Sequence, residues 1–169
     1  MSAKLLTAIL LIINFTAALM TAQDSMSEKD ISYRPATVAG AFYPENPDSL
    51  KAIIDRYLLS ELPKLAEGEV TGLTAPHAGY VYSGWIAGLA YREVQGKEYD
   101  AVIVISPSHQ KYFKGSSVFK GDAYVTPLGN AMVDKELAKS IASRYDDVRL
   151  SKDGHDWRNN PEHALEVQI

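Results

Sequence analysis

The chain has 169 residues, of which 46% are hydrophobic and 22% charged, and these values are ordinary for a globular protein with one domain. A formal net charge of −4 provides no basic surface of the kind that binds nucleic acid, so we expect no nucleic-acid partner. The absence of cysteine excludes disulfides, a cysteine nucleophile and thiolate metal ligands. A metal site in this chain would therefore use histidine, carboxylate or water.

The first 22 residues have the layout of a secretory signal peptide. Lys4 precedes an apolar stretch from Leu5 to about Leu19, and small residues follow, up to Ala22. The stretch is about 15 residues long, shorter than the roughly 20 that span a bilayer, although an uncleaved membrane anchor stays open as the alternative. We expect export to the periplasm or cell envelope, a flexible lead-in over residues 23–33 and a folded domain over residues 34–169.

The first half of that domain alternates between predicted helices and strands. Asn46-Pro47 is typical of a helix start, and an apolar stripe with helical spacing follows at Leu50, Ile53, Ile54, Tyr57 and Leu58. Residues 69–75 predict a buried strand, and residues 84–95 a helix that Ser83 caps. Residues 100–106 form a β-branched run, which predicts a parallel strand covered on both faces.

The second half predicts shorter elements. Residues 116–129 suggest a hairpin-like pair of strands, Asp134 caps a helix up to about residue 145, and a short strand precedes a polar loop near residue 150. Asn160-Pro161 predicts a further helix start. The order indicates an α/β fold of three layers, with a mostly parallel central sheet and helices on both faces. The last helix barely begins, so we expect the domain to be incomplete at its C-terminus.

Two histidines occupy the same local setting. His77 in "TAPHAGY" and His109 in "VISPSHQ" each follow an apolar run and a proline. Ligands of α/β sheets bind beyond the carboxyl ends of the strands, where both residues are predicted to lie. Neutral imidazole is the commonest metal ligand, so the two residues are candidates for a metal pair; the alternative is that each only hydrogen-bonds the backbone at a strand end.

Two further residues, His163 and Tyr80, are candidates for the same site, whereas His155 and Glu162 have simpler interpretations. His163 lies in the first turn of the predicted last helix, where the helix dipole disfavours imidazolium; it is either a neutral acid/base or a surface histidine. Tyr80 follows His77 closely and is a candidate substrate-binding residue, with core packing as the alternative. His155 is expected to be exposed in its polar loop, and Glu162 to be a carboxylate that suits the first turn of a helix.

Five ordered segments resemble one known family. "RPATVAGAFYP", "APHAGYVYSG", "ISPSH", "TPLGNAMVD" and "EHALEVQI" follow one another as in the Memo family, which includes AmmeMemoRadiSam system protein B and the eukaryotic mediator of cell motility. The resemblance implies a fold similar to the class III extradiol dioxygenases, in which two histidines and a third, later ligand bind non-haem iron. It implies His77 and His109 as ligands and His163 as acid/base. The third ligand would lie beyond Ile169.

These inferences leave two functions open. The first is a metal-dependent oxidoreductase with iron(II) or copper, resembling a dioxygenase that acts on a small molecule. The second is a non-catalytic adaptor that uses the same cleft for an anionic or phosphorylated peptide. We expect contact with a membrane only through an uncleaved N-terminal segment.

Overall fold

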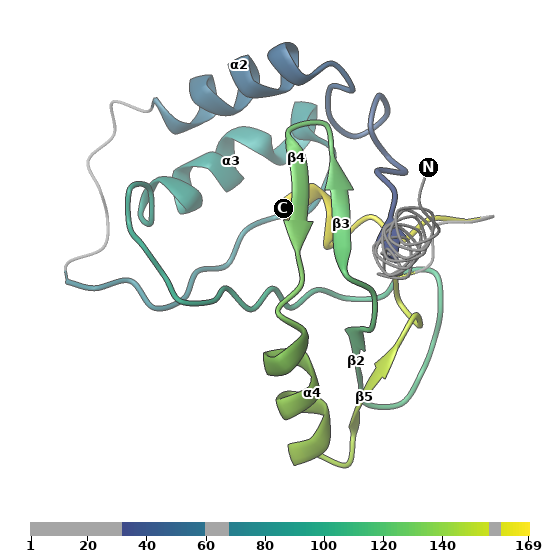
Figure 1. Ribbon diagram of the computed structural model, residues 1–169. Helices are drawn as coiled ribbons and strands as arrows, with labels where there is room; N and C mark the ends of the chain where they lie inside the picture. Colours follow the sequence, from purple (N-terminus) through teal and green to yellow (C-terminus); the bar gives the residue numbers. More distant parts are fainter. Residues whose placement is uncertain (1–31, 60–67, 156–159) are drawn as a thin grey trace, which may run out of the picture. The chain divides into compact units, whose positions relative to one another are not determined.

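The computed structural model of the protein describes residues 32–59, 68–155 and 160–169 (Figure 1). These ranges contain three α-helices and a short 3₁₀ helix: α2 (Pro47–Leu58), α3 (Tyr80–Arg92), α4 (Lys135–Arg144) and η1 (Glu166–Gln168). Their strands are β1 (Tyr33–Arg34), β2 (Ser116–Phe119), β3 (Ala123–Thr126), β4 (Gly129–Met132) and β5 (Val148–Ser151). The predicted signal peptide lies outside the described residues. Within them, no helix is both long enough and apolar enough to cross a membrane.

The strands of the described residues form two small sheets, so the fold is mixed α/β but differs from the single central sheet expected. In one sheet β1 pairs with β3 in parallel and β3 pairs with β4 antiparallel; in the other β2 and β5 run parallel. The predicted hairpin of residues 116–129 is wrong in its pairing, because β2 pairs with β5 and not with β3. The turn lies between β3 and β4, because the Thr126 hydroxyl accepts from the Leu128 N–H and donates to the Gly129 carbonyl.

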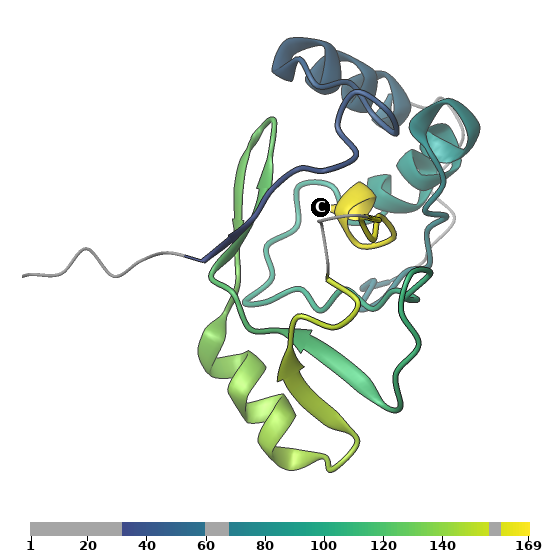
Figure 2. The same cartoon turned by 90° about the vertical axis from the view of Figure 1, so that its right-hand side faces the viewer.

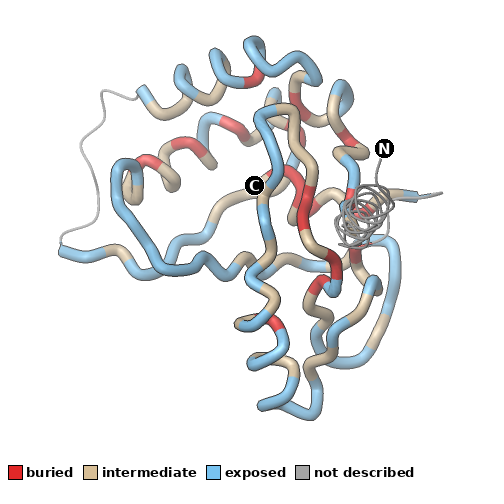
Figure 3. The backbone as a smooth tube through the Cα atoms, viewed as in Figure 1, coloured by how far each residue is buried: buried red, intermediate tan, exposed pale blue. Residues whose placement is uncertain are grey.

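Two predicted buried strands are not formed in the described structure. Residues 69–75 and 100–106 are extended but belong to neither sheet, although the Tyr99 hydroxyl donates to the Val70 carbonyl at 2.9 Å and links the two runs. Figure 3 shows the second run largely exposed, and the side chain of Ile105 is 91% accessible. A β-branched run becomes a buried strand only when neighbouring strands and helices cover it, and here its apolar side chains have no such cover.

Helices α2 and α3 pack against each other through the ring of Tyr57. Asn46 caps α2 as predicted, since its side-chain oxygen accepts from the Ser49 N–H at 2.9 Å. Helix α3 begins three residues before the predicted cap at Ser83, with Gly79 at the N-cap position, because the Tyr80 N–H donates to the Phe42 carbonyl at 2.7 Å. The segment after residue 76 is thereby tied to the N-terminal part of the domain.

The C-terminal segment forms only η1, where a longer helix was predicted. It lies beside α3 and the segment that precedes α2, as both ribbon views show (Figure 2). Val167 completes a buried apolar cluster with Val38, Tyr43 and Leu50. An α-helix from residue 161 would use the Glu162 carbonyl for its own backbone hydrogen bond, but Arg34 donates to that oxygen instead. The prediction of a regular last helix is therefore wrong.

Candidate metal centre

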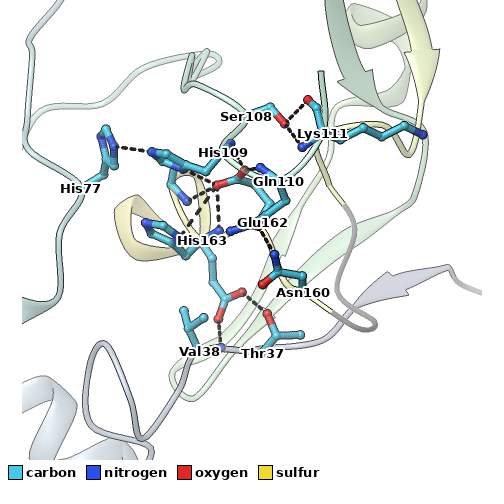
Figure 4. Close-up of polar contacts among 12 residues, drawn as sticks. Thr37, Val38, His77, Ser108, His109, Gln110, Lys111, Asn160, Glu162 and His163 are labelled. Atoms are coloured by element: carbon cyan, nitrogen blue, oxygen red, sulfur yellow. Dashed lines mark hydrogen bonds and ion pairs between the residues drawn. The ribbon is translucent and has the colours of Figure 1, made fainter. Parts of the chain in front are cut away.

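His77 and His109 face each other across the site, as their motifs predicted (Figure 4). Their Nε2 atoms lie 3.4 Å apart, and the ring planes are tilted by 50°. His77 comes from the turn that leads into α3, and His109 from the turn after the exposed run of residues 100–106. The two extended runs thus bring the histidines together without forming the buried strands that were expected to do so.

The pair has the geometry of two ligands to one metal ion. Imidazole nitrogens bind a divalent metal such as zinc at about 2.0–2.1 Å, so two nitrogens 3.4 Å apart would subtend an angle of about 110° at the ion. That angle is close to tetrahedral, so the spacing of the two nitrogens fits contact with one shared ion. The donor set is two imidazoles, which suit iron, copper and zinc.

Glu162 organises the residues around this pair. Its Oε1 contacts Nδ1 of His109 at 2.8 Å and accepts from the His163 N–H at 2.9 Å and the Ala164 N–H at 3.1 Å. Its Oε2 accepts from the backbone N–H groups of His109 and Gln110. Burial alone would raise the pKa of Glu162, but the hydrogen bonds from His109 and Ala164 lower it to about 2. The side chain is a buried carboxylate outside any regular helix, whereas the sequence predicted a carboxylate in the first turn of one.

His163 lies against the ring of His109. The two rings stack with centroids 4.7 Å apart and planes only 7° from parallel, and the ring centroid of Phe42 lies 4.5 Å from that of His163. Burial lowers the pKa of His163, and the neighbouring His109 lowers it further, so the neutral ring is favoured. The helix dipole expected to cause this effect is absent, since no regular helix begins at residue 161.

A second grouping of ligand atoms is also present. His109, Glu162 and His163 each offer one atom within 4.8 Å of the others. A nitrogen lone pair lies in the plane of its ring, however, and two stacked, nearly parallel rings direct their lone pairs along parallel planes. The carboxylate of Glu162 already receives five hydrogen bonds, which exceeds its roughly four lone-pair positions. The pair of His77 and His109 is therefore the better ligand set.

A sequence model of the family described as Memo-like protein matches residues 34–169, which is most of the chain. The chain belongs to the Memo-like family. It is 37% identical over 144 residues to a MEMO1 family protein of Pyrobaculum arsenaticum, and 36% identical over 146 residues to one of Methanocaldococcus jannaschii. A third, from Thermoplasma volcanium, is 32% identical over 136 residues.

These matches cover 80% of the chain and between 48% and 50% of each relative. The chain therefore spans about half the length of the curated relatives it matches.

The sequence also predicts roles for Tyr80 and His155 of this Memo-like chain. The Tyr80 hydroxyl donates to the Val167 carbonyl at 3.5 Å, and the ring packs between Tyr43 and Tyr57, so its role in substrate binding stays a prediction. His155 is only 7% exposed, which contradicts the predicted exposed loop. Its Nδ1 contacts the Tyr124 hydroxyl of β3 and its Nε2 the Ser117 carbonyl of β2, so the ring links one strand of each sheet.

Sequence reasoning missed the residues that hold the family motifs together. The side chains of Arg34 and Glu166 are 1% and 0% exposed and form an ion pair, so the first motif is bound directly to the last. Glu166 also accepts from the Thr37 hydroxyl, the Val38 N–H and the Tyr43 hydroxyl. A signal was available, because one arginine in the first motif and two glutamates in the last are the formally charged residues of these two segments.

Proposed function

We propose that this Memo-family protein binds a non-haem metal ion, iron(II) or copper, through His77 and His109, and acts as a metal-dependent oxidoreductase on a small molecule. The observation that carries the proposal is the 3.4 Å separation of the two Nε2 atoms, whose ring planes are tilted by 50° to each other. When bound there, such a metal would supply open coordination positions for O₂ and for a substrate with two oxygen donors.

The residues around the pair suit an acid/base role for His163. Its ring centroid lies 4.7 Å from that of His109 and 6.2 Å from that of His77, within reach of a substrate held at the pair. A neutral imidazole can accept a proton from a substrate hydroxyl and return it to the product. The ring of Phe42 also packs against His163, with centroids 4.5 Å apart.

We extend the proposal to the fold. Two histidines at the ends of successive extended runs, with a third histidine from late in the chain beside them, agree with a likeness to the class III extradiol dioxygenases. The substrate would then be a catechol or a related aromatic diol.

A second candidate is a binding protein that uses the same site without turnover. The described residues bring only two well-directed ligand nitrogens to the site, since Glu162 is fully engaged in hydrogen bonds. A metal held by two imidazoles leaves most of its positions to an anionic ligand, such as a phosphorylated peptide. Turnover separates the two candidates: oxygen uptake with a catechol panel supports the enzyme, and peptide binding without uptake supports the adaptor.

The first experiment measures metal content and affinity in four proteins. These are the wild-type chain, the His77→Ala/His109→Ala double variant, His163→Ala and His155→Gln, each loaded anaerobically with Fe(II) and separately with Cu(II). We expect the double variant to lose the metal and His163→Ala to keep it, because the stacked ring of His163 does not point to the shared position.

His155→Gln is the matched control, since it removes a histidine that lies outside the site. Unchanged metal content in the double variant, measured by elemental analysis, would overturn the proposed pair. Loss of the metal in His163→Ala alone would move the ligand set to His109, Glu162 and His163.

A further inference from the structure

The carboxylate of Glu162 receives five hydrogen bonds at this site, which leaves no free lone pair for a metal ion. The residue is 3% exposed, and its two carboxylate oxygens receive donors from both segments that build the site, residues 109–110 and residues 163–164. Figure 4 shows the carboxylate between His109 and His163, on the side away from His77. It therefore contacts one proposed ligand and the backbone of the proposed base at the same time.

The contact to His109 determines which nitrogen of that ring is free. An ionised carboxylate only accepts hydrogen bonds, so the 2.8 Å contact from Oε1 requires the ring to carry a proton on Nδ1. In the neutral ring the other nitrogen, Nε2, then keeps its lone pair. That is the atom that lies 3.4 Å from Nε2 of His77.

We propose that Glu162 is the positioning residue of the site: it holds the proton of His109 on Nδ1, directs Nε2 towards His77, and ties the same loop to the backbone of His163. The expected effect on metal affinity rests on the proposed function, in which His77 and His109 bind a metal. The position of the proton on the His109 ring does not depend on a metal. A carboxylate that binds the far nitrogen of a ligating histidine fixes its orientation and raises its basicity, and losing such a partner typically lowers metal affinity about 10–100-fold.

The backbone contacts add a second effect. The His109 N–H and the His163 N–H donate to different oxygens of one carboxylate, so the ligand and the base are held by a single rigid group. A displacement of Glu162 would move both residues relative to His77. The other carboxylate of the last segment, Glu166, binds Arg34, Thr37, Val38 and Tyr43 instead.

The test reads the protonated nitrogen of His109 directly. The metal-free full chain, labelled with ¹⁵N at histidine, is examined in alkaline solution by long-range ¹H–¹⁵N correlation. The proteins are wild type, Glu162→Ala, Glu162→Leu and Glu136→Gln. Glu136 is an exposed carboxylate of α4 that pairs with Lys139, so its variant controls for the loss of one negative charge. Glu162→Leu keeps roughly the side-chain size without any hydrogen-bond acceptor, and it serves if the alanine variant does not fold.

We expect wild type and Glu136→Gln to show His109 with its proton on Nδ1 alone. In the Glu162 variants the proton should be distributed over both nitrogens, and the affinity for Zn²⁺, used as a redox-inert probe, should fall about 10–100-fold. A purely structural role would change the folding transition without changing the tautomer.

Three outcomes decide the matter. A His109 proton on Nε2 in wild type, or an unchanged tautomer in the folded Glu162 variants, overturns the proposal. Loss of zinc with an unchanged tautomer also overturns it and makes Glu162 a direct ligand. A changed tautomer in the variants, together with a wild-type chain that binds no metal, supports the positioning role and refutes the proposed function instead.

Discussion

The four histidines show how strongly the role of a residue depends on its surroundings. His77 and His109 have partly accessible rings that face each other, whereas His155 is buried between the sheets. Both nitrogens of His155 contact protein oxygens, one from Tyr124 and one from Ser117. We therefore expect His155 to stabilise the fold and to have no part in metal binding.

His155 should make the stability of the protein depend on pH. Burial lowers its pKa below the usual histidine value, more strongly than the hydrogen bond to the Ser117 carbonyl raises it. Below about pH 6.5 the histidine ring is protonated more readily in the unfolded chain than in the folded protein. The free energy of unfolding therefore falls as the pH decreases through that value. Above it, His155→Gln should cost about 1–3 kcal/mol, because buried partners lose their hydrogen bonds.

Urea unfolding of wild type and His155→Gln at pH 8 and pH 5.5 checks this expectation. The difference between the two proteins should shrink at the lower pH, since only wild type carries the titrating ring. His77→Gln is the control, and its stability should stay within about 0.5 kcal/mol of wild type. An equal difference at both pH values would contradict the assignment.

Among single residues, the sequence predicted that the two histidines in repeated motifs would meet. It did not predict the side chains and backbone groups that hydrogen-bond the histidines. Pro76-His77 and Ser108-His109 repeat a recognisable pattern, so their meeting could be expected. The environment of His155 and the contacts of the Glu162 carboxylate with residues 109 and 110 arise from segments far apart in the chain. No local pattern encodes such contacts, and a polar loop gives no sign that it will be covered.

Among the elements, β1 and η1 depend on each other through one buried ion pair. The side chains of Arg34 and Glu166 are almost completely inaccessible, and the hydrogen bonds from Arg34, Val38 and Tyr43 offset the burial of the carboxylate and lower its pKa. Removing one partner leaves a buried charge without compensation, so Glu166→Gln should lower the free energy of unfolding by about 3–5 kcal/mol.

Denaturant titration measures this loss, and an exposed pair provides the comparison. Lys51 and Asp55 of α2 form an i, i+4 pair with side chains 68% and 51% exposed, so Lys51→Ala should change stability by less than about 1 kcal/mol. A Glu166→Gln variant as stable as Lys51→Ala would mean that the pair contributes little to the association of β1 with η1.

The contact between α2 and α3 requires a glycine in the middle of a helix. A Cβ added at Gly88 would lie 2.6 Å from Cβ of Tyr57 and 2.8 Å from its carbonyl oxygen. Glycine to alanine in a helix normally stabilises by about 0.5–1 kcal/mol, but here the helices would have to move apart. We expect Gly88→Ala to destabilise the protein by about 1–3 kcal/mol.

Thermal and urea unfolding of Gly88→Ala give the sign of the effect. Gly72→Ala is the matched control, because an added Cβ there meets no atom within 4 Å. A stabilised Gly88→Ala protein would show that the two helices can separate without cost.

The sequence predicted α2 and α4 well because their caps are local: Asn46 and Asp134 each accept a backbone hydrogen bond from the third residue after them. The predicted start of α3 was less accurate. The Tyr80 N–H at the start of this helix donates to the Phe42 carbonyl, which lies in a distant part of the chain. The strands at residues 69–75 and 100–106 were predicted from apolar runs alone. An apolar run indicates that a segment would be stabilised by burial, but the strands and helices that would bury it come from other parts of the chain.

For the whole molecule, the exposed apolar run of residues 102–105 bears on whether the chain self-associates in solution. Val102, Ile103 and Ile105 are 75%, 63% and 91% exposed, and the run belongs to neither sheet. Extended β-branched segments with free backbone groups template pairing with other chains. We therefore expect this chain, on its own, to self-associate as its concentration rises.

A single charge in the run should reduce that association without affecting the fold. Ile105→Lys places an ammonium group where the side chain is almost fully exposed, so it costs little in the monomer but opposes edge-to-edge pairing. The sedimentation of wild type should shift to larger species over a concentration series, whereas Ile105→Lys should stay closer to the monomer at the same melting temperature. Tyr112→Lys is the matched control, since Tyr112 is 95% exposed and lies outside the run. Equal relief of association by both substitutions would point to net charge as the cause, and no relief by Ile105→Lys would place the self-association on another surface, such as the exposed face of α3.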